Sequence, residues 1–119
     1  MKRTRIVLAG MPRLLLDTVT AIVTARPEMT VSGRIQDTAD IRMAVRKARA
    51  DVVIVSEHLE PGRQDYRELL YSRPRLKVLS ITSDGHRFFL HELGPFRTPL
   101  GEISPESLVQ AIQSTGRQV

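Results

Sequence analysis

The chain has 119 residues, of which 41% are hydrophobic. This is enough apolar material for one compact core, so a single domain spanning residues 1–119 is expected. Eighteen lysines and arginines against thirteen acidic residues give a formal net charge of +5, which favours loose association with polyanions and defines no function by itself. The absence of cysteine excludes a disulfide framework, a thiolate metal site and a cysteine nucleophile.

The sequence predicts neither a membrane span nor a signal peptide. The longest apolar runs, such as residues 14–16 and 52–55, fall far short of the roughly 20 residues that cross a bilayer. The N-terminus is basic, but the apolar run at residues 6–9 is too short for the core of a signal peptide. We therefore expect a soluble, cytoplasmic protein with no membrane partner.

The first two elements are a strand and a helix. Residues 5–9 form a short apolar run broken by Gly10 and Pro12, which is typical of a strand buried on both faces. Residues 13–26 then carry apolar side chains at helical spacing. This stripe consists of Leu15, Val19, Ile22 and Val23.

A second strand and helix follow. Residues 29–35 alternate and contain β-branched side chains, which predicts a strand. Residues 39–50 place apolar side chains on one helical face and arginines on the other. The arginines of that face are Arg42, Arg46 and Arg49.

The middle of the chain contains the clearest strand. Residues 51–56 are continuous, short and β-branched, the pattern expected at the centre of a parallel sheet. A weaker helix is predicted for residues 64–72, followed by a strand at residues 77–82.

In the last third, Asp84-Gly85 between two apolar segments favours a hairpin, with residues 86–93 as an antiparallel edge strand. Ser104-Pro105-Glu106 is a helix start, with serine as the cap and proline at the first helical position. The alternation of strands and helices predicts a doubly wound α/β fold, with a mainly parallel five-stranded sheet and helices on both faces.

This order of elements resembles the CheY-like receiver domain of bacterial two-component response regulators. Residues 51–56 resemble the family's third strand, Pro-Asp-Val-Val-Leu-Leu-Asp, and Glu60-Pro61-Gly62 resembles the Met-Pro-Gly turn after it. Residues 104–112 are similar to the family's Ser-Pro-Glu-Glu-Leu-Leu-Glu-Ala-Ile start of the last helix. Residues 83–101 fit least, because the segment is about three residues short by alignment to the family pattern, so we expect the fourth helix to be shortened or replaced by a β-hairpin.

The resemblance implies a phosphorylation site that this sequence has lost. Receivers transfer a phosphoryl group to an aspartate after the third strand, and two further carboxylates help to hold Mg²⁺. A hydroxyl and a lysine complete that site, and here only the hydroxyl is retained. The acidic pair aligns with Ala9-Gly10 or Gly10-Met11, the acceptor with Ser56, the hydroxyl with Thr82 and the lysine with Gly101.

Without these carboxylates we expect no metal, no cofactor and no phosphotransfer, and hence no enzyme activity, because serine does not form an acyl phosphate. A phosphoreceiver that uses an unconventional acid, Glu57 or Glu60, is the competing hypothesis. The pleat turns Glu57 away from the face of Ser56, and a single acid binds Mg²⁺ poorly.

Other chemical sites are disfavoured. No pair among His58, His86 and His91 has the spacing of a helical metal site. Ser56 and Thr82 lack a nucleophile elbow, which argues against a hydrolase, and no glycine-rich phosphate loop occurs. The basic side chains can touch phosphates without reading a sequence, so no sequence-specific DNA binding is expected from this chain alone. These side chains are Arg42, Arg46, Lys47, Arg49, Arg73, Arg75 and Lys77.

The leading hypothesis is a phosphorylation-independent pseudo-receiver that acts through a protein partner or as a homodimer. Its interaction surface is expected in the remodelled region, at Phe88, Phe89, Leu90, Phe96 and Leu108. Two alternatives stay open. One is a ligand-sensing domain that binds a small neutral molecule in the vacated acidic cleft. The other is the regulatory half of a transcription factor, whose DNA-binding output domain is expected if the chain continues past Val119.

Overall fold

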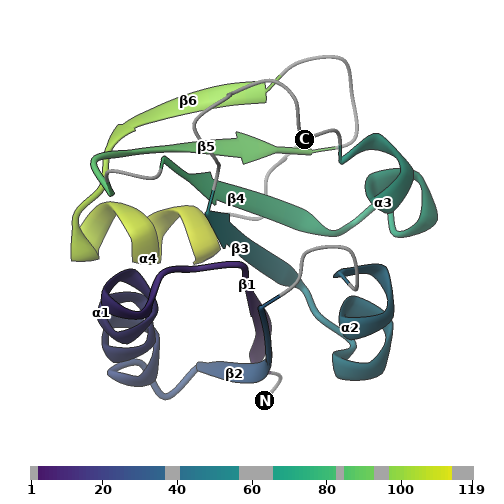
Figure 1. The fold of residues 1–119 in the computed structure, drawn as a ribbon, viewed down its shortest axis with the longest axis horizontal. Helices are drawn as coiled ribbons and strands as arrows, with labels where there is room; N and C mark the ends of the chain where they lie inside the picture. Colours follow the sequence, from purple (N-terminus) through teal and green to yellow (C-terminus); the bar gives the residue numbers. More distant parts are fainter. Residues whose placement is uncertain (1–2, 37–40, 57–65, 83–84, 93–96, 114–119) are drawn as a thin grey trace.

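In a computed structural model, the described residues of the chain form a mixed six-stranded sheet in the order β2-β1-β3-β4-β5-β6, flanked by four helices (Figure 1). The structure describes residues 3–36, 41–56, 66–82, 85–92 and 97–113. The side chains of residues 67, 68, 97 and 98 lie outside this description.

Four strands run parallel, as the sequence predicts. They are β2 (Met29–Ile35), β1 (Thr4–Ala9), β3 (Val52–Ser56) and β4 (Lys77–Ile81). Every residue of β3 and β4 is buried, because these strands lie inside the sheet and are covered on both faces. Most of these residues are apolar, as such a position requires, and the buried polar exceptions are Ser56, Lys77 and Ser80.

The predicted hairpin is present, but the predicted strand count is wrong. β5 (Arg87–His91) pairs antiparallel with β4, and β6 (Arg97–Glu102) pairs antiparallel with β5. The sheet therefore has six strands instead of five, and β5 is an inner strand instead of an edge. β6 escaped prediction because Pro99 and Gly101 interrupt its β pattern, and both residue types are tolerated on an edge strand.

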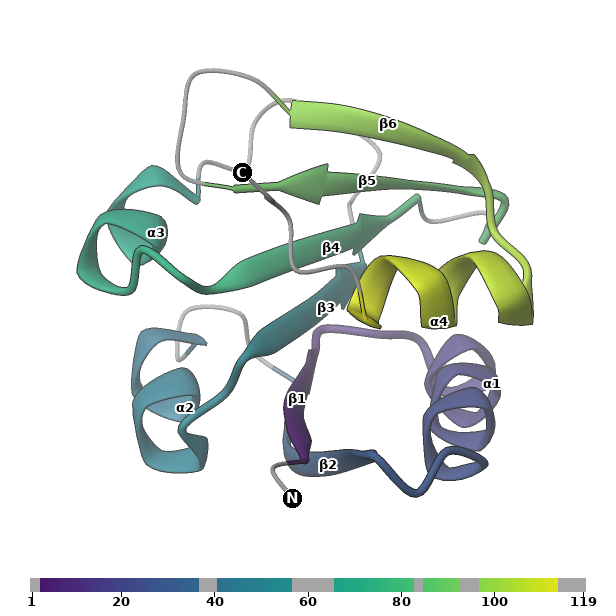
Figure 2. The ribbon, with the colours of Figure 1, turned by 180° about the vertical axis from the view of Figure 1, so that it is seen from behind.

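Helices cover both faces of the sheet, as predicted (Figures 1 and 2). α1 (Arg13–Thr24) and α4 (Pro105–Gln113) lie on one face, and α2 (Ile41–Ala48) and α3 (Arg67–Ser72) lie on the other. The start of α4 is confirmed in detail, because the Ser104 hydroxyl accepts a hydrogen bond from the Ser107 N–H at 3.0 Å.

Each face has its own hydrophobic core. Side chains from α1 and α4, including Val19, Val23 and Leu108, pack against the first face with Phe88 of β5. Val45 of α2 and the pair Leu69 and Leu70 of α3 pack against the second face. In the described part of the chain, no helix is long and apolar enough to span a membrane.

Candidate functional site

The fold brings three of the aligned receiver positions together at the carboxyl edge of the sheet. Ala9 of β1 is paired with Val55 of β3, and Ser56 is paired with Ile81 of β4. The segments that follow, Gly10-Met11 and Thr82, therefore begin beside Ser56. This edge is where open α/β sheets place their sites.

The residues that align with the acidic positions of receivers have structural roles here, in the backbone turn after β1 and in the apolar core. Gly10 has a left-handed φ of 61°, and its N–H donates to the Ile35 carbonyl at 2.9 Å. Ala9 is fully buried, and Met11, 5% exposed, packs into the core beneath α1 and α4. With Ser56 and Thr82, these positions supply no carboxylate, so they do not fit Mg²⁺.

Thr82 has a structural role in the turn between β4 and β5. Its hydroxyl oxygen accepts a hydrogen bond from the Arg87 N–H at 3.1 Å, and its own N–H donates to the Arg87 carbonyl at 2.9 Å. Gly85, with φ 78°, donates its N–H to the Thr82 carbonyl at 2.8 Å. The hydroxyl that aligns with the receiver hydroxyl is thus hydrogen-bonded within the hairpin of β4 and β5.

Gly101 is separated from the other aligned positions. It lies in β6, where the adjacent Glu102 pairs with Arg87 of β5, so β5 stands between Gly101 and β4. Two strand spacings amount to roughly 10 Å. The expectation that Gly101 takes the lysine's place beside Thr82 is wrong, because an antiparallel strand has been inserted there.

The predicted interaction surface is only partly available. Phe88 is 1% exposed and Leu108 is fully buried, so both belong to the core and cannot contact a partner. The prediction is wrong for these two because alternation along β5 turns Phe88 inward, and the apolar face of α4 carries Leu108. Phe89 and Leu90 are half-buried, and Phe96 lies outside the described residues.

The hollow nearest to the aligned positions lies beside them. It has a volume of about 600 Å³ and includes Met11, but its described lining contains neither Ser56 nor Thr82. It carries the charged side chains of Arg13, Asp17 and Arg34. Its lining consists of Met11, Pro12, Arg13, Leu16, Asp17, Thr20, Arg34 and Gln36.

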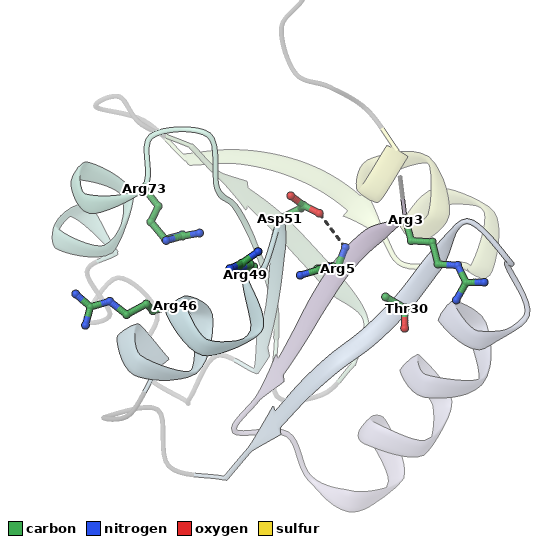
Figure 3. A pocket seen from close by; sticks show the side chains of 7 residues that line it. All are labelled: Arg3, Arg5, Thr30, Arg46, Arg49, Asp51 and Arg73. Atoms are coloured by element: carbon green, nitrogen blue, oxygen red, sulfur yellow. Dashed lines mark hydrogen bonds between the residues drawn. The ribbon is translucent and has the colours of Figure 1, made fainter. Parts of the chain in front are cut away.

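A larger hollow, of about 1020 Å³, opens at the opposite, amino edge of the sheet (Figure 3). Five arginines from separate parts of the chain meet there around one aspartate. The lining residues are Arg3, Arg5, Thr30, Arg46, Arg49, Asp51 and Arg73. We call this the arginine pocket.

Local structure holds the arginine pocket at two points. The Asp51 carboxylate accepts a hydrogen bond from the Arg5 N–H at 2.9 Å, which ties the start of β3 to β1. Just after α2, Arg49 has a φ of 52°, and its backbone N–H donates a hydrogen bond to the Arg46 carbonyl. The Ala50 N–H donates to the Val45 carbonyl. This is a Schellman cap, whose left-handed position is usually glycine.

Sequence reasoning identified basic residues on the second helix but missed this convergence. Parallel strands all begin at one edge, so residues just before β1, β3 and β4 must lie together, and that signal was available. The sequence analysis also wrongly grouped Lys77 with the residues that can contact phosphates. Lys77 is only 7% exposed, and its ammonium group donates a hydrogen bond to the Ala111 carbonyl at 2.9 Å.

A second missed feature is a polar pair within the hairpin. Ser80 Oγ and His91 Nε2 lie 2.9 Å apart, and the His91 ring stands edge-on to Tyr66, with ring centroids 4.8 Å apart. Ser80 is fully buried, so it is not placed to act as a nucleophile. His86 is exposed, and in the described part of the chain no cluster of three or more potential metal ligands occurs.

Among the comparisons with known proteins, only the one with solved structures bears on the fold. No family model and no curated protein matches the sequence significantly. Among solved structures, the chain is similar to the RcsB response regulator of Salmonella typhimurium, in a study of its DNA interaction, with 14% identity and a TM-score of 0.59. That match covers 72% of this chain and 45% of the RcsB chain.

It is also similar to the isolated receiver domain of RcsB from Salmonella enterica serovar Typhimurium, determined with the phosphomimetic BeF₃⁻. This match has 14% identity and a TM-score of 0.57, and covers 68% of this chain and 62% of the other. The chain has a receiver-like fold. In both cases it matches less than two thirds of the length of the solved chain.

Proposed function

We propose that this chain is a pseudo-receiver of the two-component type, which regulates through protein contacts and not through phosphorylation or catalysis. The observation that carries the proposal is the packing of Met11. A side chain that is 5% exposed and part of the core stands where one alignment places a metal-binding acid. The alternative alignment, through Ala9, meets a fully buried position as well.

Two further observations support the loss of phosphotransfer. Ser56 stands at the acceptor position, and a serine cannot form the acyl phosphate of a receiver. In receivers the hydroxyl contacts the phosphoryl group, whereas Thr82 is hydrogen-bonded to Arg87 in the hairpin turn. The missing acids and the hydrogen bond of the Thr82 hydroxyl within the hairpin both support a site that does not transfer phosphoryl groups.

The proposed contact surface is the edge of the hairpin of β5 and β6, with the half-buried Phe89 on one face of the sheet and Leu90, packed against the first core, on the other. β6 is the edge of the sheet, and an edge strand presents unpaired backbone groups that can add a strand from a partner. Pro99 limits such pairing to part of the strand. A homodimer or a different protein can use this surface.

The experiment is incubation with acetyl phosphate and Mg²⁺, followed by intact-mass measurement, with a receiver that retains its aspartate as the positive control. We expect no added phosphoryl mass on this chain while the control is modified. Stoichiometric phosphorylation that is lost in Glu57→Gln or Glu60→Gln would instead make the domain an unconventional phosphoreceiver.

A second candidate is the regulatory part of a DNA-binding protein. It is favoured by one observation, namely that the match covers only 45% of a response regulator whose structure was studied for its interaction with DNA. In this candidate function, the chain is the regulatory part and acts together with a DNA-binding domain. Binding of small neutral ligands is less favoured, because the adjacent hollow carries Arg13, Asp17 and Arg34.

A further inference from the structure

We infer that the arginine pocket binds a phosphate chain of two or more phosphate groups, either as a nucleotide or as free pyrophosphate. This site lies at the amino edge of the sheet, away from the receiver positions at the carboxyl edge, and it goes beyond the proposed function. The first observation is that five arginines line one hollow, with three of their guanidinium groups pointing toward its middle. Guanidinium groups match phosphate oxygens in geometry and charge.

The arginines divide into an inner and an outer group (Figure 3). Arg5, Arg49 and Arg73 point toward the middle of the pocket, from β1, from the cap of α2 and from the end of α3. Arg3 and Arg46 stand at its two ends and point outward. The inner group can hold one phosphate. A second phosphate toward either end of the pocket comes within reach of Arg3 or Arg46 when that side chain turns inward.

A purely structural role does not account for this arrangement. Basic residues at helix C-termini offset the helix dipole, which explains part of the placement of Arg46, Arg49 and Arg73. Arg3 and Arg5 belong to the start of a strand, where no such benefit exists. Within the described residues, none of the five guanidinium groups makes a hydrogen bond or an ion pair, so they do not cap helix carbonyls either.

The backbone of Arg49 is the second, independent observation. The Schellman cap needs a left-handed residue at this position, which glycine adopts without strain and arginine does not. Unusual backbone conformations of this kind are concentrated at functional sites. Placing an arginine here directs a guanidinium into the pocket at a cost in stability that a ligand-binding role justifies.

The shape of the site favours a small ligand over a nucleic acid duplex. The arginines line an open hollow of about 1020 Å³, a size in which small molecules bind, and all of them except the half-buried Arg73 are exposed. A duplex is contacted by elements that protrude into its grooves. Asp51, inside the same pocket, repels a phosphate but can accept a hydrogen bond from a ribose or base, which leaves room for a nucleotide.

The test is isothermal titration at physiological ionic strength with pyrophosphate, ADP and orthophosphate. We expect saturable binding of pyrophosphate and ADP, at least tenfold tighter than orthophosphate. Equal affinity for pyrophosphate and ADP assigns the site to the phosphate chain alone, and tenfold tighter ADP binding assigns it to a nucleotide. No saturable binding of either at millimolar concentration overturns the inference.

Variants separate a built site from general charge. Arg49→Gln and Arg73→Gln should each weaken pyrophosphate binding tenfold or more, because charged hydrogen bonds are lost. Arg13→Gln removes the same charge at the other edge of the sheet and should change the affinity for pyrophosphate by less than twofold. Asp51→Asn should tighten binding severalfold by removing a negative charge, while keeping an oxygen for the Arg5 N–H.

Two results would contradict the inference. One is an equal loss of affinity in Arg13→Gln and Arg49→Gln, which indicates attraction to net charge alone. The other is tight binding of a short DNA duplex that pyrophosphate does not displace and that Arg73→Gln abolishes, which makes the face a nucleic-acid surface. Melting curves of each variant show whether it is folded.

Discussion

The hydroxyl oxygen of Thr82 lies 3.1 Å from the backbone nitrogen of Arg87 and accepts its hydrogen bond, closing the turn that joins β4 to β5. Thr82 aligns with the hydroxyl position of receivers, and its contribution to stability is open to direct measurement. Thr82→Ala should lower the free energy of unfolding by about 1 kcal/mol, the typical value of a net hydrogen bond. Thr82→Ser keeps the hydroxyl and should retain most of that stability in urea titrations.

The packing of Met11 predicts that an acid cannot simply be restored at this position. Met11→Asp places an unpaired carboxylate in the core and should destabilise the protein by more than about 2 kcal/mol, or prevent folding. Met43, which is 64% exposed on α2, provides the matched control, and Met43→Asp should change stability by under about 1 kcal/mol. Similar losses in both variants would show that Met11 is not a core residue.

The burial of Phe88 and Leu108 predicts that these side chains stabilise the fold and are unavailable to partners. Phe88→Ala should cost about 3–5 kcal/mol and Leu108→Ala about 2–5 kcal/mol of unfolding free energy. Leu14, at 80% exposure on α1, is the control, and Leu14→Ala should stay within about 0.5 kcal/mol. Denaturant unfolding measures all three, and a folded Phe88→Ala protein of unchanged stability would contradict the inward orientation of this ring.

The left-handed backbone of Arg49 predicts a trade-off between stability and binding. Arg49→Gly should raise the free energy of unfolding by about 1 kcal/mol, because glycine is unstrained at the helix cap. Arg49→Ala removes the same guanidinium without relieving the backbone, and should show no comparable gain. Both variants should lose pyrophosphate affinity. Equal stabilities of the glycine and alanine variants would mean that the cap is not strained.

Sequence patterns predicted the elements whose local preferences agree with the tertiary structure. Residues 52–55 are all apolar and β-branched, and they form an inner strand as expected. Ser104 and Pro105 start a helix because capping is a local interaction. β6 was missed because Pro99 and Gly101 disfavour a strand locally, and only pairing with β5 makes one.

The candidate sites divide in the same way. Alignment by strand predicted that Ser56 and Thr82 lie at neighbouring strand ends, and the pairing of β3 with β4 confirms this. The position of Gly101 could not be predicted in this way, because it depends on the insertion of β5 between β4 and β6. The arginine pocket depends on contacts between residues far apart in sequence, such as Arg5 and Asp51, which no local pattern records.

The central claim is that this receiver-like fold does not respond to phosphorylation, and the most direct test is its sedimentation mass and melting temperature with and without Mg²⁺ and beryllofluoride. Beryllofluoride mimics the phosphoryl group on an aspartate, and an intact site requires carboxylates to hold the metal. We predict that neither quantity changes at millimolar concentrations. A shift in either one that disappears in Glu57→Gln or Glu60→Gln would contradict the account and make the domain a phosphorylation switch.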